Sequence, residues 1–196
     1  MTPRLDPDHL RHHLARRERR RIAEPSLCAS AVLVPLLLKA AGPHLVLTKR
    51  TAHLSHHASQ ICFPGGRVEP TDADLLAAAL RESQEEVGIA PEHVDVLGPL
   101  DDTMTLGRFR ITPFLGVIPD PYPFRLDPTE VDRLIEVPLG YFLDPARVRV
   151  ERMPFPDGAL HPVHFYDVGD EVVWGATARI IHEWLSWMTG MGAPEA

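Results

Sequence analysis

The chain has 196 residues, of which 44% are hydrophobic and 24% are charged, and its formal net charge is −7. This length and composition are typical of one globular domain that buries a sizeable core. The acidic balance argues against a general nucleic-acid binder, which is usually basic. The basic start is not followed by an apolar stretch of signal-peptide type, and the apolar run 32–38 is too short to span a membrane. We therefore expect neither nucleic acid nor membrane as a partner.

Both cysteines, Cys28 and Cys62, stand in apolar runs. Buried thiols are typical of a reducing compartment, in which disulfides are rare. We therefore expect two buried, reduced cysteines and a cytoplasmic protein.

Residues 8–22 are expected to form a helix that is rich in arginine. It belongs to an N-terminal helical extension, residues 1–26. A basic arm for an anionic partner is one interpretation, and a solvated helix that packs Leu10 and Leu14 on the domain is the other. The overall acidity of the chain favours the second interpretation.

Two strands follow, at residues 30–38 and 44–49, with a turn at Ala41-Gly42-Pro43 between them. The segment Phe63-Pro64-Gly65-Gly66 is an apolar run that ends in a tight turn. Paired glycines let the backbone approach a ligand closely, which suits a pyrophosphate. An ordinary strand-to-helix turn would use the same residues, so this segment alone does not distinguish a ligand-binding turn from a purely structural one.

A helix is expected over residues 76–87, with Thr71 or Asp72 as its N-cap. At 3.6 residues per turn, five side chains share the core face. They are Leu76, Ala79, Leu80, Ser83 and Val87.

On a neighbouring face of this helix, Glu82, Glu85 and Glu86 stand at positions i, i+3 and i+4. Like charges at these spacings repel one another and disfavour the isolated helix. A divalent cation such as Mg²⁺ would compensate them, since it takes oxygen ligands from carboxylates and phosphates. The alternative is a solvated acidic helix face, which is the usual interpretation of a charge run.

Taken together, residues 63–89 resemble the Nudix box, whose pattern is Gly, five residues, Glu, seven residues, and then Arg-Glu-apolar-x-Glu-Glu-x-Gly-apolar. The matching positions are Gly66, Arg81, Glu82, Glu85, Glu86, Gly88 and Ile89. In three departures, Asp72 replaces the first Glu, eight residues separate it from Arg81, and Ser83 replaces an apolar residue. Glu69 is an alternative to Asp72 for the role of that first acidic residue.

The resemblance implies an α/β fold, an α/β/α sandwich with a mixed β-sheet, and a single Nudix hydrolase domain over residues 1–196. It also implies Mg²⁺- or Mn²⁺-dependent hydrolysis of a nucleoside diphosphate derivative. Glu82, Glu85 and Glu86 would bind the metal, one of them would act as general base, and Arg81 would orient them. The resemblance leaves three points open: the identity of the glutamate that acts as base, the number of bound ions and the oligomeric state.

A second run is similar to the coenzyme A pyrophosphatases of the same superfamily. The matching residues are Leu47, Thr48, Arg50, Thr51, Phe63, Pro64, Gly65 and Gly66. This resemblance implies cleavage of coenzyme A to 3′,5′-ADP and 4′-phosphopantetheine, with Arg50, Phe63, Gly65 and Gly66 contacting the substrate. Ser55 stands where the family has Arg, and Ser59 where it has Gly, so ADP-ribose, a dinucleotide or another nucleoside diphosphate derivative stays an alternative substrate. A Nudix-fold binding module without catalysis is the alternative of another class.

The loop before the box also contains His53, His56 and His57. A transition-metal site is one interpretation, and surface histidines without a third ligand are the favoured one. A third is that one histidine, with Lys49 or Arg50, replaces the missing Arg as a phosphate contact.

Further strands are expected at residues 94–100, 109–118 and 130–137, with a proline-rich loop at 119–128 and a helical turn at 138–143. Either Glu130 or Glu136 is a candidate for an extra metal or water contact, and an exposed strand charge is the alternative. Residues 148–153 and 162–168 are expected to pair as a hairpin. Three aromatic residues there are candidates for a substrate pocket or for packing, namely Phe155, Phe165 and Tyr166.

The last predicted element begins at Trp174 and continues as a helix to about Met188. Its apolar stripe predicts a face that packs on the core. The stripe consists of Ile180, Ile181, Trp184, Leu185 and Met188.

Overall fold

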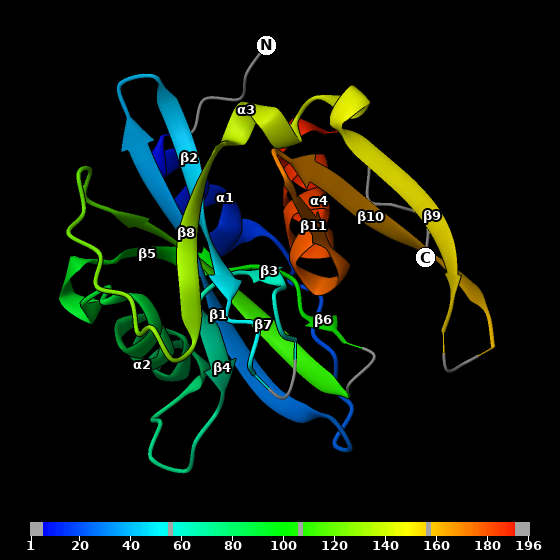
Figure 1. The fold of residues 1–196 in the computed structure, drawn as a ribbon, viewed down its shortest axis with the longest axis horizontal. Coiled ribbons are helices and arrows are strands. Elements are labelled where there is room, and N and C mark those ends of the chain that lie inside the picture. The colour runs from blue at the N-terminus through cyan, green and yellow to red at the C-terminus, as the bar shows by residue number, and fades with distance from the viewer. Residues whose placement is uncertain (1–5, 55–56, 106–107, 156–157, 191–196) are drawn as a thin grey trace.

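The computed structural model describes residues 6–54, 57–105, 108–155 and 158–190. Within these ranges the chain forms a large mixed sheet, a smaller three-stranded sheet and four α-helices (Figure 1). None of the described helices combines the length and the apolar character that a membrane span needs.

The large sheet is built around two long strands, β1 and β7, which run parallel side by side. Along the sheet the order is β3-β2-β1-β7-β5, and the edges are completed by β4 on β1, β6 on β7 and β8 on β2. All the other pairs are antiparallel, which confirms the predicted mixed sheet. The strands are β1 (Cys28–Lys39), β2 (Gly42–Arg50), β3 (Ile61–Cys62), β4 (Gly65–Arg67), β5 (Asp95–Pro99), β6 (Thr103–Met104), β7 (Phe109–Ile118) and β8 (Val131–Pro138).

Helices cover both faces of this sheet because its central strands are apolar on both sides. On β1, Leu33 and Leu37 pack in a cluster with Val87 of α2 (Leu75–Val87). The alternate residues Val34 and Leu36 belong to a second cluster on the other face. That cluster contains residues of α1 (Pro7–Arg16) and α4 (Gly175–Thr189). Since successive strand residues point to opposite faces, the layers are helix, sheet and helix, as predicted.

The first helix is shorter than expected. α1 ends at Arg16, and the backbone of Arg17 is already extended, with φ −83° and ψ 136°. The prediction that it continues to residue 22 is wrong because the chain leaves the helix to pair with acidic residues after β5. The backbone N–H of Ile22, for example, donates to Asp102 at 3.0 Å. Leu10 and Leu14 are buried, which confirms that this helix packs on the domain.

The central helix α2 begins later than either predicted N-cap. Its N-cap is Asp74, whose carboxylate accepts from the N–H of Ala77 at 2.8 Å. Asp72 is thereby left to bind another partner. Of the predicted core face, Ala79, Ser83 and Val87 are buried, while Leu76 and Leu80 are half-buried.

The helix α2 ends at Gly88, whose φ of +73° lies in the left-handed region that favours glycine. The N–H groups of Gly88 and Ile89 satisfy the last carbonyls of the helix, those of Gln84 and Ser83. The presence of glycine at position 88 of the box is therefore explained by the backbone conformation that ends α2.

The smaller sheet consists of β9 (Val148–Pro154), β10 (Leu160–Val168) and β11 (Glu171–Trp174). The predicted hairpin of β9 and β10 is confirmed. Strand β11 was not expected, because its four residues are too few to display a period. Tyr166 is buried in the core, whereas Phe165 is half-buried and stacks on the exposed Trp174.

Several smaller expectations can also be compared with the structure. The first turn lies at Ala40-Ala41, because β2 already begins at Gly42. Cys28 and Cys62 are free thiols, but Cys28 is exposed, so its expected burial is wrong. Cys28 is the first residue of β1, and the buried part of this strand begins only two residues later. The remaining helical elements are α3 (Leu139–Phe142), η1 (Pro91–His93) and η2 (Pro145–Arg147).

Candidate active site

The guanidinium of Arg81 binds three carboxylates on one side of α2. Its Nε and Nη2 donate to the two oxygens of Asp72 at 2.9 and 3.1 Å. Its Nη1 donates to Glu82 at 3.1 Å and to Glu85 at 3.0 Å. This charge-assisted fork lowers the pKa of Asp72, since the hydrogen bond from Arg81 favours the ionised form. Asp72, and not Glu69, therefore contacts the arginine of the box.

Glu86 differs from the other two glutamates because it points into the protein, where it is only 3% exposed. Its Oε2 accepts from the backbone N–H of Gly65 at 3.0 Å, and its Oε1 accepts from Arg50 at 3.1 Å. Burial raises the pKa of Glu86 to about 7, even though these two donors oppose the shift. The nearby carboxylates of Glu82 and Glu130 raise it further. The ionised form of Glu86 is therefore disfavoured in this site as long as no further positive charge binds there.

The turn at Gly65 and Gly66 needs both glycines, for different reasons. Gly65 has φ +149°, and a Cβ there would lie 2.4 Å from the carbonyl oxygen of Ala31. A Cβ on Gly66 would lie 2.4 Å from the carboxyl carbon of Glu82, and would push this carboxylate away from the loop. The two glycines thus let a backbone strand, β4, lie directly against the acidic face of α2.

Arg50 is the last residue of β2 and links α2 to the loop before β8. Its Nη1 donates to Glu86, and its Nη2 lies 3.5 Å from Oε2 of Glu130. The backbone of Glu130 is fixed as well, since its carbonyl accepts from the N–H of Thr51 at 2.9 Å. Glu136 lies elsewhere and pairs with Lys39 at 2.5 Å. Of the two acidic residues predicted as extra contacts, only Glu130 reaches the site.

The proline-rich loop before β8 is attached to α2 at the position of Glu86. The N–H of Asp127 donates to the carbonyl of Glu86 at 2.9 Å, and that of Arg125 donates to the carbonyl of Val87 at 3.0 Å. The sequence could not reveal these backbone contacts. They explain why Glu130, which follows in the same loop, lies opposite Glu86.

Two residues expected at the substrate side face elsewhere. Phe63 is buried in the core, where it supports the glycine turn from behind. Lys49 binds Glu171 of β11 at 2.5 Å, because neighbouring residues of a strand point to opposite faces. The thiol of Cys62 lies 3.2 Å from the hydroxyl of Thr48, and burial raises its pKa to about 11.

The loop between β2 and β3 is partly described. Ser55 and His56 lie outside the described residues, whereas His53 and His57 are exposed. Ser59 has φ +59°, in the left-handed region, where the resembling family has the more permissive glycine. Within the described ranges, no three His, Cys, Asp or Glu side chains converge as metal ligands. No histidine metal site is therefore seen there.

The chemistry of the donors nevertheless fits a hard divalent cation. Glu82, Glu85 and Glu86 offer carboxylate oxygens beside a backbone turn that leaves room for them. In this structure Arg81 binds both Glu82 and Glu85 through one nitrogen, Nη1, while Arg50 binds Glu86. A cation held by these carboxylates would compete with the two arginines for their oxygens.

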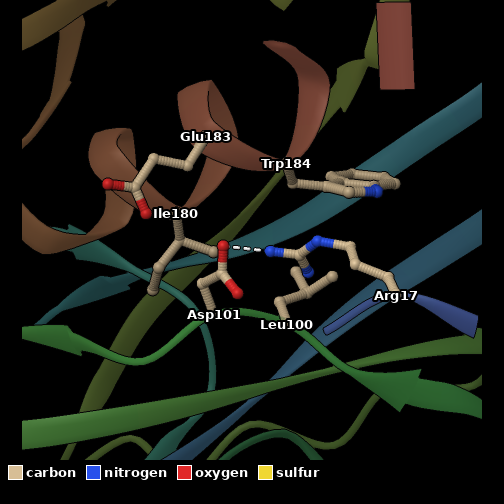
Figure 2. Close-up of a pocket in the computed structure, with 6 residues that line it drawn as sticks. All are labelled: Arg17, Leu100, Asp101, Ile180, Glu183 and Trp184. Carbon is tan, nitrogen blue, oxygen red and sulfur yellow. Dashed lines mark ion pairs between the residues drawn. The ribbon is translucent and has the colours of Figure 1, made fainter. Parts of the chain in front are cut away.

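A separate small cavity of about 10 Å³ lies between the N-terminal segment and α4 (Figure 2). It is lined by Arg17, Leu100, Asp101, Ile180, Glu183 and Trp184. Its volume suits about one water molecule. Because Arg17 pairs with Asp101 across it, this cavity is part of the structural packing.

The comparison with known families agrees with the geometry of α2 and the glycine turn. The model of the NUDIX domain matches residues 29–139. The chain belongs to the NUDIX family. Nudix hydrolases named NudL from Salmonella paratyphi B and Salmonella enteritidis PT4 are each 42% identical over 154 residues, and the match covers 79% of this chain and 79% of each relative. The chain is therefore a Nudix hydrolase, and enzymes of this family generally use divalent cations.

Solved structures support the fold. The Nudix hydrolase RenU from M. smegmatis has a TM-score of 0.56 at 16% identity, and the match covers 86% of this chain and 90% of that one. An Ap4A hydrolase from C. elegans, solved as a binary complex, has a TM-score of 0.50 at 21% identity over 57% of this chain and 80% of that one. At these identities, the likeness confirms the Nudix fold alone.

Proposed function

We propose that this Nudix hydrolase cleaves the pyrophosphate bond of coenzyme A or its derivatives, giving 3′,5′-ADP and 4′-phosphopantetheine. The observation that carries the proposal is the buried Glu86 between the glycine turn and Arg50. The substrate is inferred from the run of residues 47–66 that resembles coenzyme A pyrophosphatases. A small diphosphate ester, and not a nucleic acid, suits a net charge of −7.

Glu82, Glu85 and Glu86 would hold Mg²⁺ or Mn²⁺. When bound, these cations neutralise the charge of a diphosphate and help to activate water. The acidic site supports this role, because Arg50 is paired with Glu86 and yet burial still raises the pKa of that carboxyl to about 7, with Glu82 and Glu130 adding to the shift. One of the three glutamates would accept the proton of the attacking water.

The other site residues would bind and orient. Arg81 holds Glu82 and Glu85 in place through its anchor on Asp72, so its role is positional. Gly65 and Gly66 would bring backbone N–H groups close to a phosphate. Arg50 would contact the diphosphate, and Phe63 would support the turn from the core.

We also propose that residues 1–196 form one Nudix domain with residues 1–26 as its N-terminal extension. The burial of Leu10 and Leu14 against the central sheet supports this view. A cytoplasmic location is in keeping with two free thiols.

A substrate panel tests the proposal and its alternatives. Purified protein is incubated with Mg²⁺ or Mn²⁺ and with coenzyme A, ADP-ribose or a dinucleotide, and the nucleotide products are separated. Release of 3′,5′-ADP from coenzyme A is the expected result. Preferential release of AMP from ADP-ribose or a dinucleotide would instead assign the alternative substrate class, given Ser55 and Ser59.

A control without the buried carboxylate excludes contaminating hydrolases. Glu86→Gln, purified in parallel, should release nucleotide at least about 100-fold more slowly than the wild type. If the wild-type protein binds the cation but hydrolyses none of the diphosphates, the enzyme proposal fails and a binding module is favoured.

A further inference from the structure

The arginine at the end of β2 is bound by acidic residues from two different elements. Arg50 donates to Glu86 of α2 at 3.1 Å and lies 3.5 Å from Glu130, which precedes β8. The side chain of Arg50 is 20% exposed, so solvent screens these contacts only in part.

Each oxygen of Glu86 already accepts one hydrogen bond. Oε2 accepts from the N–H of Gly65, and Oε1 accepts from Arg50. The Gly65 contact is fixed by the backbone, because Gly65 pairs with Val32 of β1. The Arg50 contact is made by a side chain that has a second acceptor, Glu130, on its far side. A cation that coordinates Oε1 would lie close to the guanidinium of Arg50, so the two positive charges would compete for this oxygen.

We propose that Arg50 is a resident counter-cation, which competes with the divalent cation for Glu86 and which the cation releases for contact with the substrate phosphate. Glu130 keeps the released guanidinium at the edge of the site. This inference rests on the proposed hydrolysis of a diphosphate, and makes Arg50 a residue that couples cation binding to substrate binding.

The competition predicts opposite effects from one substitution. Arg50→Met removes the competitor, so Mn²⁺ should bind more tightly to the metal-free protein. The same change removes a phosphate contact, so the KM for the diphosphate substrate should rise. A role in packing alone would weaken both kinds of binding or neither.

Mn²⁺ binding to the metal-free full chain is measured by electron paramagnetic resonance, without substrate. We expect Arg50→Met to bind Mn²⁺ about tenfold more tightly, which corresponds to about 1.4 kcal/mol. Arg50→Lys keeps the charge but loses the fork that reaches both carboxylates, so it should also bind Mn²⁺ more tightly than the wild type. Thermal unfolding of each variant verifies that it is folded.

Lys49→Met is the matched control. It removes a positive charge from the adjacent residue, but Lys49 binds Glu171 on the other face of the sheet. Its Mn²⁺ affinity should equal that of the wild type. The proposal is overturned if Arg50→Met binds Mn²⁺ no more tightly than the wild type. It is also overturned if Arg50→Lys equals the wild type, because the effect would then be one of charge at a distance.

The binding experiment separates this inference from the proposed function. Mn²⁺ affinity is measured without any substrate, so it does not depend on which diphosphate is cleaved. If the wild type hydrolyses no diphosphate and the Mn²⁺ affinities still change as expected, only the proposed function fails. If hydrolysis occurs and the affinities do not change, only the competition fails.

Discussion

Two groups of arginine–carboxylate pairs in this protein have the same chemistry and different consequences. In the N-terminal segment, Arg17 pairs with Asp101 (Figure 2) and Arg19 pairs with Asp102. Along α2, Arg81 and Arg50 bind the glutamates of the site. The first group fastens the extension to the domain, and the second surrounds the candidate active site.

The difference lies in how completely each buried carboxylate is satisfied. Asp102 and Glu86 are both 3% exposed. Burial alone would raise the pKa of Asp102, but hydrogen bonds from Thr112, Ile22 and Arg19 lower it. Glu86 has fewer donors and two acidic neighbours, so burial raises its pKa to about 7. A satisfied carboxylate stabilises a fold, whereas an incompletely satisfied one is suited to bind a further cation.

The largest expected effect is on turnover. Glu86→Gln should reduce kcat by about 100- to 10,000-fold, in the range of essential acid–base and metal-site groups. Because it removes an incompletely compensated buried charge, the free energy of unfolding without metal should not fall. Steady-state kinetics and urea unfolding measure the two quantities. Retained turnover would show that Glu86 is not part of the reaction.

The corresponding change among the N-terminal ion pairs should lower the free energy of unfolding and leave kcat unchanged. Asp102→Asn leaves Arg19 without its charged partner in a buried place, which costs about 3 kcal/mol. Urea unfolding measures the loss, and kcat at a temperature where the variant is folded should equal that of the wild type. A large fall in kcat with unchanged stability would reverse the roles assigned to the two groups.

Divalent cations should stabilise the protein through only one of the two groups. At a Mn²⁺ concentration of about 100 times Kd, binding to the folded state adds about 2.7 kcal/mol. Thermal unfolding should show this increase in the wild type and in Asp102→Asn, but not in Glu86→Gln. An equal increase in all three proteins would place the cation outside the acidic site.

The smallest expected effect is the pH dependence of the Asp102 contribution. Its pKa in the folded protein lies below its ordinary value, so the unfolded state binds more protons as the pH falls. The contribution is therefore complete above about pH 4 and is lost as the pH falls through the folded-state pKa. The stability difference between wild type and Asp102→Asn should be constant from pH 7 to 5 and smaller at pH 3. A difference that grows at pH 3 would contradict the assignment.

Much of this architecture could be predicted from local patterns. The predicted bounds of strand β7 equal the observed ones, and those of α2 agree within one residue. Both elements are long enough for their apolar pattern to define the type of secondary structure. The N-cap of α2 was missed because Asp72 binds Arg81, nine residues later. The end of α1 was missed because the arginines that follow it bind distant partners, as Arg19 binds Asp102, 83 residues later. Strand β11 was missed because it is short and depends on its pairing with β10.

The Nudix box could be recognised from the residues alone, because Arg81 and the three glutamates are spaced by the period of one helix. The tertiary structure was needed to establish that Glu86 is buried while Glu85 is exposed, since that depends on β4 and the loop before β8 covering one side of α2. It also decided that Arg50 binds Glu86 and Glu130, residues 36 and 80 positions away. Contacts at such separations depend on strand order and side-chain direction, which no local pattern encodes.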